Sequence, residues 1–557
     1  MNKRPVQLFL TLLLAVALIA VFLTLRSSGE RSPTGHAIGT PTDPPNVLLI
    51  IADDLGVDKL GAYADDVDPA YRDSAGFLPD TPVLDGLAEV GVRFTDAWAN
   101  PTCSPTRATI FTGNSGFRTG VGLPVGHQEA SELDYSVTTL AETLKLEGYT
   151  SGMFGKWHLG ENDAPDGWRE EDEVRWEAHL GERVSFEAPP LAQGWDMFRG
   201  SISGTLDGAE GDGYYHWLAL ENDRCEDCGV NNTLEVFQIT EYATIQSIND
   251  ARTWIARQDK PWMASVTLNA PHSPFELPPE GCSYRPEDAE SPKNTQGIYE
   301  EMVECMDIQI GVLLDDIDDL ENTLVIFIGD NGSSSAVAEG IYDDGRGKGT
   351  VYESGIRVPL IIADGEAILG LEPTEEELAD CDPASQTIAL GAGGCQETTL
   401  SAACGPAPLR IEERGSVSSA LVHSVDLYAT IAEVAGADGS DGLDAISLLP
   451  LLTGGEGPAR GVIYSESFAN NGAGSFALRR GDWKLISTVK ETDGGLCRMN
   501  YQLYDLGADR GETESLLADE KNIKAADRET RDSLLAELDA LADSAEEPPW
   551  FVVDACP

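Results

Sequence analysis

The chain has 557 residues, enough for several domains and a large core, and its apolar content of 41% excludes wholesale disorder. It carries 37 basic and 95 acidic residues, a formal net charge of −58 that repels nucleic acids and anionic membranes and argues against such partners. Because the acidic residues are spread along the chain, we interpret them as a solvated surface adapted to salty surroundings.

The N-terminus carries Lys3 and Arg4, followed by an apolar run over residues 6–25. This pattern predicts export, with the rest of the chain in the periplasm, outside the cell or anchored on the outer side of a membrane. The run is long for a signal core and lacks a clear cleavage site, so residues 1–26 are either a cleaved signal peptide or a retained membrane anchor. Residues 27–45, rich in Ser, Pro, Gly and Thr, predict a flexible tether.

Ten cysteines are compatible with an oxidising compartment. Cys225 and Cys228 form a CxxC pair, but no second pair or neighbouring histidines complete a zinc pattern. A disulfide or a structural loop is therefore the better interpretation of this pair. Cys305 lies in a helical pattern and could be a buried free thiol.

Residues 46–51 (NVLLII) form an apolar run of strand length, typical of a strand buried on both faces. The run leads directly to Asp53 and Asp54. Adjacent carboxylates repel each other unless a positive charge lies nearby, and oxygen ligands suit Ca²⁺ or Mg²⁺. Two solvated acids in a turn are the alternative for such a pair taken alone.

An extended run over residues 92–99 follows a predicted helix and leads to the sequence CSPTR, in which a second helix begins. Ser104 is predicted to cap this helix, and Pro105 suits its first helical position, where a missing N–H costs nothing. Cys103 would then lie where backbone N–H groups favour negative charge, with Arg107 one turn further on. A small buried apolar residue is the alternative for an isolated cysteine.

A short strand after a helix over residues 137–147 ends on the sequence GKWHLG, which carries Lys156 and His158. Two such residues after a strand can point into one cleft. An exposed basic turn is the alternative, and it is weakened because cations are scarce in this chain. Residues 161–235 show little periodicity and predict long loops, where substrate contacts usually lie.

The next predicted elements are a helix, a strand, a helix and a strand over residues 239–258, 262–268, 298–319 and 323–329. The first of these strands leads to His272, which lies between two prolines and could also be a histidine packed in a turn. The second ends on Asp330 and Asn331. The sequence GRGKGT then carries Lys348 and precedes a strand-like run over residues 356–361.

Polar clusters thus follow four predicted core strands, each at the carboxyl end. The clusters are Asp53 with Asp54, Lys156 with His158, His272, and Asp330 with Asn331. In α/β sheets, sites form at the carboxyl ends of the strands. Unrelated turns would not place four polar clusters at the same topological position, so the sequence predicts one composite site.

With these residues, the chain resembles the type I, formylglycine-dependent, arylsulfatase-like sulfatases of the alkaline phosphatase superfamily. CSPTR followed by TG matches the family signature C-x-P-x-R…TG. Further blocks match in the same order: NVLLIIADDLG, GYTSGMFGKWHLG, NAPHSPF, GDNG and GRGKGTVYESGIRVPLI. The resemblance covers residues 45–520 and departs at a cysteine-containing insertion over residues 363–416.

The resemblance implies an α/β catalytic domain over residues 46–455, with a large mixed, mainly parallel sheet sandwiched by helices as in alkaline phosphatase. It implies a smaller C-terminal α+β subdomain over residues 456–557 that bears an antiparallel sheet. We expect residues 477–487 and 501–506 to supply strands of that sheet.

The resemblance also implies that a formylglycine-generating enzyme converts Cys103 to an aldehyde, which is hydrated to a geminal diol. A calcium ion would be bound by the modified Cys103 together with Asp53, Asp54, Asp330 and Asn331.

By the same resemblance, Arg107 and Lys156 would hold and polarise the diol. His158 would take the proton when sulfate is expelled. His272 and Lys348 would grip the sulfate and protonate the leaving oxygen.

This chemistry is coherent because one diol hydroxyl can attack sulfur while the second expels the sulfate by regenerating the aldehyde, which a serine could not do. The predicted function is hydrolysis of aryl or carbohydrate sulfate monoesters. One alternative is a phosphonate or phosphate monoester hydrolase of the same superfamily. Another is a non-catalytic protein that binds sulfated glycans.

Overall fold

The computed structural model describes residues 44–551 apart from a set of internal segments. These segments are 67–77, 128–129, 161–182, 186–188, 207–212, 223–232, 260, 287–289, 339–345, 371–410, 440–441, 443, 456–459, 493–494, 499–500, 520 and 546–550. The signal or anchor segment, nearly all of the tether, the CxxC pair and most of the insertion therefore lie outside the described residues. Within the described part, no helix combines the length and apolar character needed to cross a membrane.

The strand β1 (Asn46–Ala52) lies inside an 11-stranded sheet, and all seven of its residues are buried. Its side chains alternate between the two apolar cores that cover the sheet, as the period of a strand requires. Leu49 belongs to one core, for example, and Leu48 and Ile50 belong to the other. Burial on both faces explains why the sequence of this strand is continuously apolar.

The strands follow one another across the sheet in an order that differs from the chain order. This order is β12 (Ser416–Ser418), β2 (Val92–Phe94), β11 (Leu360–Asp364), β10 (Thr323–Gly329), β1, β9 (Trp262–Thr267), β4 (Thr150–Gly155), β6 (Met197–Gly200), β7 (Trp217–Asn222), β8 (Thr233–Ile239) and β5 (Arg183–Ser185). The neighbouring strands β10, β1, β9, β4 and β6 are parallel to one another. Their carboxyl ends therefore meet at one edge of the sheet.

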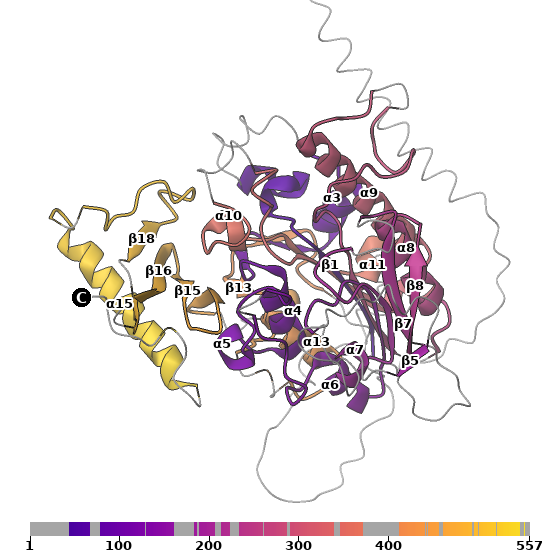
Figure 1. Cartoon of the computed structure of the whole chain (residues 1–557), viewed down its shortest axis with the longest axis horizontal. Helices are drawn as coiled ribbons and strands as arrows, with labels where there is room; N and C mark the ends of the chain where they lie inside the picture. The colour runs from indigo at the N-terminus through magenta and orange to yellow at the C-terminus, as the bar shows by residue number, and fades with distance from the viewer. Residues whose placement is uncertain are drawn as a thin grey trace, which may run out of the picture. The chain divides into compact units, whose positions relative to one another are not determined.

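Helices cover both faces of this sheet (Figure 1). One core includes side chains from α3 (Pro82–Val90), α8 (Ala243–Ile255) and α9 (Thr295–Asp315). The other includes side chains from α4 (Cys103–Thr112), α6 (Leu140–Leu146) and α13 (Asp426–Val434). The helix α6 begins with a capping box in which Thr139 and Glu142 satisfy each other's backbone N–H groups.

Shorter elements complete this part of the chain. They are η1 (Val57–Lys59), η2 (Gly61–Asp66), β3 (Ala97–Trp98), α5 (Gly116–Thr119), α7 (Pro189–Ala192), η4 (Leu320–Asn322), α10 (Glu353–Ile356), α11 (Gly365–Ile368), β13 (Val422–His423) and α14 (Leu449–Leu452). The strands β3 and β13 pair in parallel as a small separate sheet.

A second, antiparallel sheet lies in the C-terminal part of the chain. Its strands are β14 (Ile463–Phe468), β15 (Gly474–Arg480), β16 (Trp483–Thr492), β17 (Gly495–Arg498) and β18 (Gln502–Asp505). The helix α15 (Ala525–Asp543) packs on β15 and β16 through Leu534 and Leu538, and it is the yellow helix in Figure 1. The expected strand region 477–487 is a hairpin, because Gly481 turns the chain with a φ of +56°.

These sheets confirm the predicted fold class: a large mixed sheet between helices, parallel at its centre, with a smaller C-terminal antiparallel sheet. The boundary between residues 455 and 456 stays a prediction.

The prediction of long loops over residues 161–235 holds for described segments such as 201–206 but is wrong where this region forms strands. Strands β5, β6 and β7 and the start of β8 lie there and extend the sheet beyond β4. Short strands of this kind are stabilised by pairing with their neighbours rather than by local periodicity, so the sequence pattern did not reveal them.

The strand expected over residues 356–361 begins later, at Leu360, and α10 ends at Ile356. Between them, Arg357 forms an isolated bridge with Trp98 of β3. The segment thus pairs with β3 before it joins the main sheet.

Cys305 is not the free thiol that its helical context suggested. It forms a disulfide with Cys282, and Cys497 is also disulfide-bonded. Among the described residues, Cys103 is the free cysteine, and it is buried.

Candidate active site

The polar segments that follow β1, β4, β9 and β10 lie together at one edge of the sheet. Backbone hydrogen bonds continue beyond the strand ends: Asp330 N donates to Ala52 O at 2.9 Å, and Lys156 N donates to Thr267 O at 2.7 Å. The sheet itself therefore fixes the main chain of these residues. The structure places the four segments at one edge, as the sequence predicts.

Glycine is required where β4 leads to Lys156. Gly155 has a φ of +111°, and a Cβ at this position would lie 2.1 Å from Thr267 O. No other residue could bring the strand end so close to β9 in this conformation. The approach directs Lys156 toward the end of β1.

Cys103 is the first residue of α4, whose N-cap is Thr102. The predicted cap was Ser104, and this detail is wrong, because Thr106 N already donates to Thr102 O. Ser104 lies inside the first turn, and its Oγ accepts a hydrogen bond from Val125 N at 2.9 Å. The prediction that Pro105 is the first helical residue is also wrong, because α4 already begins at Cys103. Pro105 still lies in the first turn, where its missing N–H has no helical partner to lose.

The sulfur of Cys103 lies between the carboxylate of Asp53 and the ammonium group of Lys348. Its Sγ donates to Asp53 Oδ1 at 3.2 Å and accepts from Lys348 Nζ at 3.5 Å. Burial raises the pKa of the Cys103 thiol above its usual value, and the charge of Asp53 raises it further. The thiol is therefore protonated at neutral pH, although it lies at a helix N-terminus, and it is a poor nucleophile.

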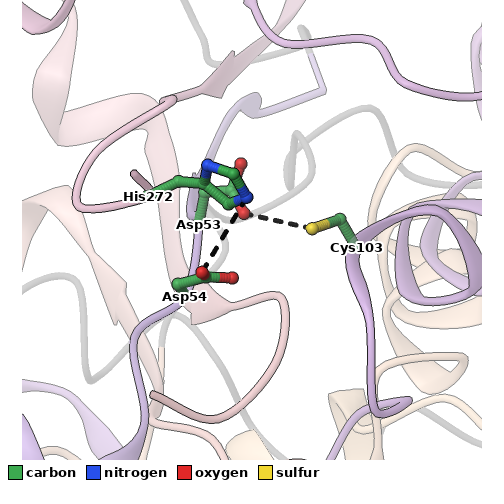
Figure 2. Close-up of side chains that lie close together, drawn as sticks. All are labelled: Asp53, Asp54, Cys103 and His272. Atoms are coloured by element: carbon green, nitrogen blue, oxygen red, sulfur yellow. Dashed lines mark hydrogen bonds and ion pairs between the residues drawn. The ribbon is translucent and has the colours of Figure 1, made fainter. Parts of the chain in front are cut away.

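Four potential metal ligands converge at this point. Ligand atoms of Asp53, Asp54, Cys103 and His272 all lie within 4.8 Å of one another (Figure 2). Asp54 has a φ of +66°, which turns its side chain back toward this group. It also connects the group to β10, because its N donates to Asp330 Oδ1 at 3.2 Å.

Three cations from three different segments face these carboxylates. Lys156 Nζ lies 2.5 Å from Asp53 Oδ2, and Lys348 Nζ lies 2.5 Å from Asp54 Oδ1. Arg107 Nη2 donates to an oxygen of Asp330 at 3.0 Å.

The pairing changes the pKa values of the partners. Burial alone would raise the pKa of Asp53, but Lys156 and other nearby cations hold it well below its usual value. Burial opposes the charge of Lys348, yet the Asp54 carboxylate raises the pKa of Lys348 well above its usual value. Both groups are therefore charged at neutral pH.

Asn331 offers an oxygen suited to a metal ion. Its Nδ2 donates to Asp54 Oδ1 at 2.9 Å, which directs the amide toward the carboxylates. Its Oδ1 is buried and has no hydrogen-bond partner among the described residues. Burial and the charge of Asp53 also raise the pKa of Asp330 above its usual value. The neighbouring cations therefore do not fully offset the cost of keeping this carboxylate charged. The donor set therefore fits a hard divalent cation.

His158 is buried, with a φ of +59°, and its Nε2 lies 3.0 Å from Val125 O. A carbonyl oxygen only accepts, so Nε2 carries the proton in the neutral ring and Nδ1 carries the lone pair. Nδ1 has no hydrogen-bond partner in the described part of the chain. Burial and the nearby Lys156 hold the pKa of His158 well below its usual value, which keeps the ring neutral.

His272 shows the opposite tautomer. Its Nδ1 donates to Ser273 O at 2.6 Å, so that Nε2, 3.9 Å from Asp54 Oδ2, carries the lone pair in the neutral ring. Burial lowers the pKa of His272, and the charges of Asp54 and Asp53 only partly oppose this effect.

The site is open to solvent on one side. The side chains of His272 and Lys348 are 16% and 20% exposed, whereas those of Arg107 and Lys156 are fully buried. A substrate arriving from solvent would therefore meet His272 and Lys348 first.

Two tyrosines that the sequence patterns did not identify hold the backbone of the site segments through their hydroxyl groups. Tyr214 OH is 2.8 Å from both Asn269 O and His272 O, and Tyr299 OH donates to Asp54 O at 2.9 Å. Tyr214 lies in a region without periodicity and Tyr299 on an ordinary helical core position. No local signal could have identified either residue.

A family model described as Sulfatase matches residues 45–437, which is most of the chain. Human arylsulfatase A is 28% identical over 499 residues, covering 85% of this chain and 83% of the relative. An ulvan-active sulfatase from Formosa agariphila is 29% identical over 387 residues, covering 65% of this chain and 64% of the relative. The residues matched by the family model include every segment that contributes to the site.

Solved structures show the same fold. The structure of Ps i-CgsB in complex with k-i-k-neocarrahexaose superposes with a TM-score of 0.61 at 21% identity, covering 91% of this chain and 95% of that one.

Calcium binding to the folded protein is expected to raise the thermal unfolding midpoint of metal-depleted protein, because the ligand oxygens converge only in the folded state. At a concentration of 100 times Kd the stabilisation would be about 2.7 kcal/mol. Asp54→Asn should abolish most of the shift, which differential scanning calorimetry measures.

Asp316→Asn is the control, since Asp316 pairs with Arg252 at a partly exposed position away from the site. It should retain the full calcium shift. Equal shifts in both variants, or no shift in the unchanged protein, would contradict a calcium site at Asp54.

Proposed function

This chain belongs to the sulfatase family and is a sulfuric ester hydrolase, and we propose that it acts through a formylglycine made from Cys103 beside a bound calcium ion. The observation that carries the proposal is the position of Cys103. Cys103 is the first residue of the buried helix α4, within the CSPTR sequence. Its Sγ lies between Asp53 and Lys348.

Calcium would be held by Asp53, Asp54, Asp330 and Asn331, together with the modified side chain at position 103. The unpartnered Asn331 Oδ1 and the convergent carboxylates support this assignment. When bound, the ion supplies positive charge that polarises an oxygen of the sulfate group.

The thiol itself is unsuited to the reaction, because burial and Asp53 raise its pKa and keep it protonated. Conversion to an aldehyde removes this difficulty, since the hydrated aldehyde supplies a hydroxyl nucleophile and a way to release the sulfate. Asp53 accepts a hydrogen bond from the side chain at position 103 and is placed to hold such a hydroxyl.

The charges of the site suit an anionic ester. Asp53, Asp54 and Asp330 balance Arg107, Lys156 and Lys348 in number, so a divalent cation would leave an excess of two positive charges. A sulfate monoester is then attracted locally, although the whole protein carries a net charge of −58. Repulsion from the rest of the surface is screened beyond roughly 10 Å at moderate salt.

Two side chains can move protons at defined atoms. His158 Nδ1 is neutral, buried and unpartnered among the described residues, so it is suited to accept a proton when sulfate is expelled. Lys348 Nζ is charged and partly exposed, so it can donate to the leaving oxygen. His272 Nε2 accepts in its neutral form, so His272 would help to hold the sulfate only when protonated or through a shared proton.

We also propose that the protein is exported. The basic and apolar N-terminal sequence supports this, and so does the Cys282–Cys305 disulfide, because such bonds are typical of oxidising compartments. Residues 1–45 fused to a reporter that is active only outside the cytoplasm should direct it there. The molecular mass of the fusion protein would distinguish a cleaved signal peptide from a retained membrane anchor. A reporter that stays in the cytoplasm would contradict export.

The modification predicts two properties of position 103. In protein made together with a formylglycine-generating enzyme, the peptide that contains Cys103 should show the mass deficit of thiol-to-aldehyde conversion. Cys103→Ala should lose turnover completely, and Cys103→Ser should release at most one equivalent of alcohol per enzyme, because a sulfated serine cannot expel its sulfate. Mass spectrometry and burst kinetics measure these outcomes, and full turnover by Cys103→Ala would contradict the mechanism.

The substrate class can be measured with a panel of nitrophenyl sulfate, nitrophenyl phosphate and sulfated sugars. We expect sulfate esters to be hydrolysed with kcat/KM about 100-fold above phosphate esters, because the chain belongs to the sulfatase family, whereas the excess positive charge of the calcium-loaded site would attract both kinds of ester. A preference for phosphate would favour the related phosphoesterases instead.

A further inference from the structure

The loop that carries Lys348 is bound at both ends by the C-terminal part of the chain. Residues 346–353 lead from the site to α10, and Lys348 lies near the start of this loop. Its partners at the two ends are Gly511, Glu512, Lys484 and Gln502, all from the C-terminal part of the chain.

Arg346 anchors the first end of the loop. Its Nη1 donates to Gly511 O at 3.1 Å and also to Glu512 O. The guanidinium lies over the ring of Tyr352, 4.3 Å from its centroid, and Tyr352 OH donates to Gln502 Oε1 at 3.0 Å. Both ends of the loop are thus held against each other and against the C-terminal part of the chain.

Glu512 binds the second end of the loop. Its Oε2 accepts a hydrogen bond from Glu353 N at 2.5 Å, and its Oε1 lies 2.8 Å from Lys484 Nζ. Lys484 also pairs with Glu353 Oε1 at 3.1 Å and lies over the ring of Trp98. Lys484 is fully buried and both carboxylates nearly so, so these contacts are little screened by solvent.

The backbone of Glu512 is itself held in an unfavourable conformation. Its φ is +56°, in the left-handed region that residues other than glycine rarely occupy. Such a conformation persists only where the surrounding contacts determine it, and here it presents both the carbonyl group and the carboxylate of Glu512 to the loop.

The middle of the loop contacts the catalytic part of the chain. Lys348 N donates to Ser333 O at 3.1 Å, and Gly349 N donates to Pro101 O at 2.7 Å. Only the side chain of Lys348 then extends to Asp54 and to Cys103. The backbone of Lys348 is thus fixed both by these contacts and by the anchored ends of the loop, and together they set where Nζ lies relative to its two partners.

We propose that Glu512 is a positioning residue, which sets the location of the Lys348 ammonium through the loop 346–353. The inference rests on the role proposed above for Lys348 in stabilising the leaving oxygen. It makes the C-terminal part of the chain a component of the active site, although none of its described residues contacts the carboxylates there.

Glu512→Ala is expected to lower kcat/KM by about 10- to 100-fold, because misplacing a catalytic group by a fraction of its hydrogen-bond length has effects of this size. The loss should grow with the pKa of the leaving phenol across a series of aryl sulfates, as it should in Lys348→Ala. A loss of general stability would lower all rates equally, without changing this dependence.

The double variant tests whether the two residues act as one unit. If Glu512 acts through Lys348, the double variant should be no slower than Lys348→Ala alone. Glu512→Gln keeps the acceptor for Glu353 N and should recover most of the activity. Glu537→Gln is the control, because Glu537 pairs with Arg480 at a partly exposed position of the same C-terminal part and should be unaffected.

If the activity losses of the two single variants multiply in the double variant, the inference is overturned. It is also overturned if the rates of Glu512→Ala depend on the pKa of the leaving phenol in the same way as those of the unchanged enzyme. Wild-type rates in Lys348→Ala would instead remove Lys348 from the reaction and overturn the proposed role of this lysine. If Glu512→Ala does not fold, Arg346→Ala provides the same test, because it releases the other end of the loop.

Discussion

The structure depends on the burial of opposite charges at the edge of a parallel sheet. Three carboxylates and three cations, all largely removed from water, lie at the carboxyl ends of β10, β1 and β4 and on the neighbouring α4 and Lys348 loop. Taking such groups out of water costs several kcal/mol each unless they are paired, and removing one partner of a buried pair typically costs about 3–5 kcal/mol. The arrangement therefore survives only because every member is held in place by the sheet, by α4 or by the Lys348 loop.

This requirement explains how distant parts of the chain cooperate. The sheet positions Asp53, Lys156 and Asp330 through backbone hydrogen bonds at the strand ends. Other groups of the site lie on α4, on the Lys348 loop or several residues beyond a strand end, so they need further supports. Tyr214 fixes the segment of His272, and the C-terminal part fixes the loop of Lys348. A single site is thus supported both by the large sheet and by the C-terminal part of the chain.

Much of this could be predicted from the sequence, since the apolar strands and the polar residues directly after them are local patterns. Asp53, Lys156 and Asp330 were identified in this way, and CSPTR marked the helix that begins at Cys103. The supports could not be predicted, because Glu512 and Tyr214 act through contacts with residues far away in the sequence. For the same reason the strands β6 and β7 were not predicted, because pairing with neighbouring strands stabilises them. The prediction of a free thiol at Cys305 was wrong because its disulfide partner is 23 residues away. The resemblance to sulfatases supplied roles for the residues, and the burial of Cys103 beside Asp53 explains why its unmodified thiol stays protonated.

The central claim is that the carboxylate cluster holds a calcium ion beside an oxygen-bearing side chain derived from Cys103. A crystal structure of the matured, calcium-loaded enzyme, with anomalous scattering to identify the ion and the sulfur atoms, tests it most directly. The account predicts calcium bound by oxygens of Asp53, Asp54, Asp330 and Asn331, and a side chain at position 103 that has lost its sulfur signal. A sulfur atom still present at position 103 in active enzyme, or a cluster that contains no ion, would contradict it.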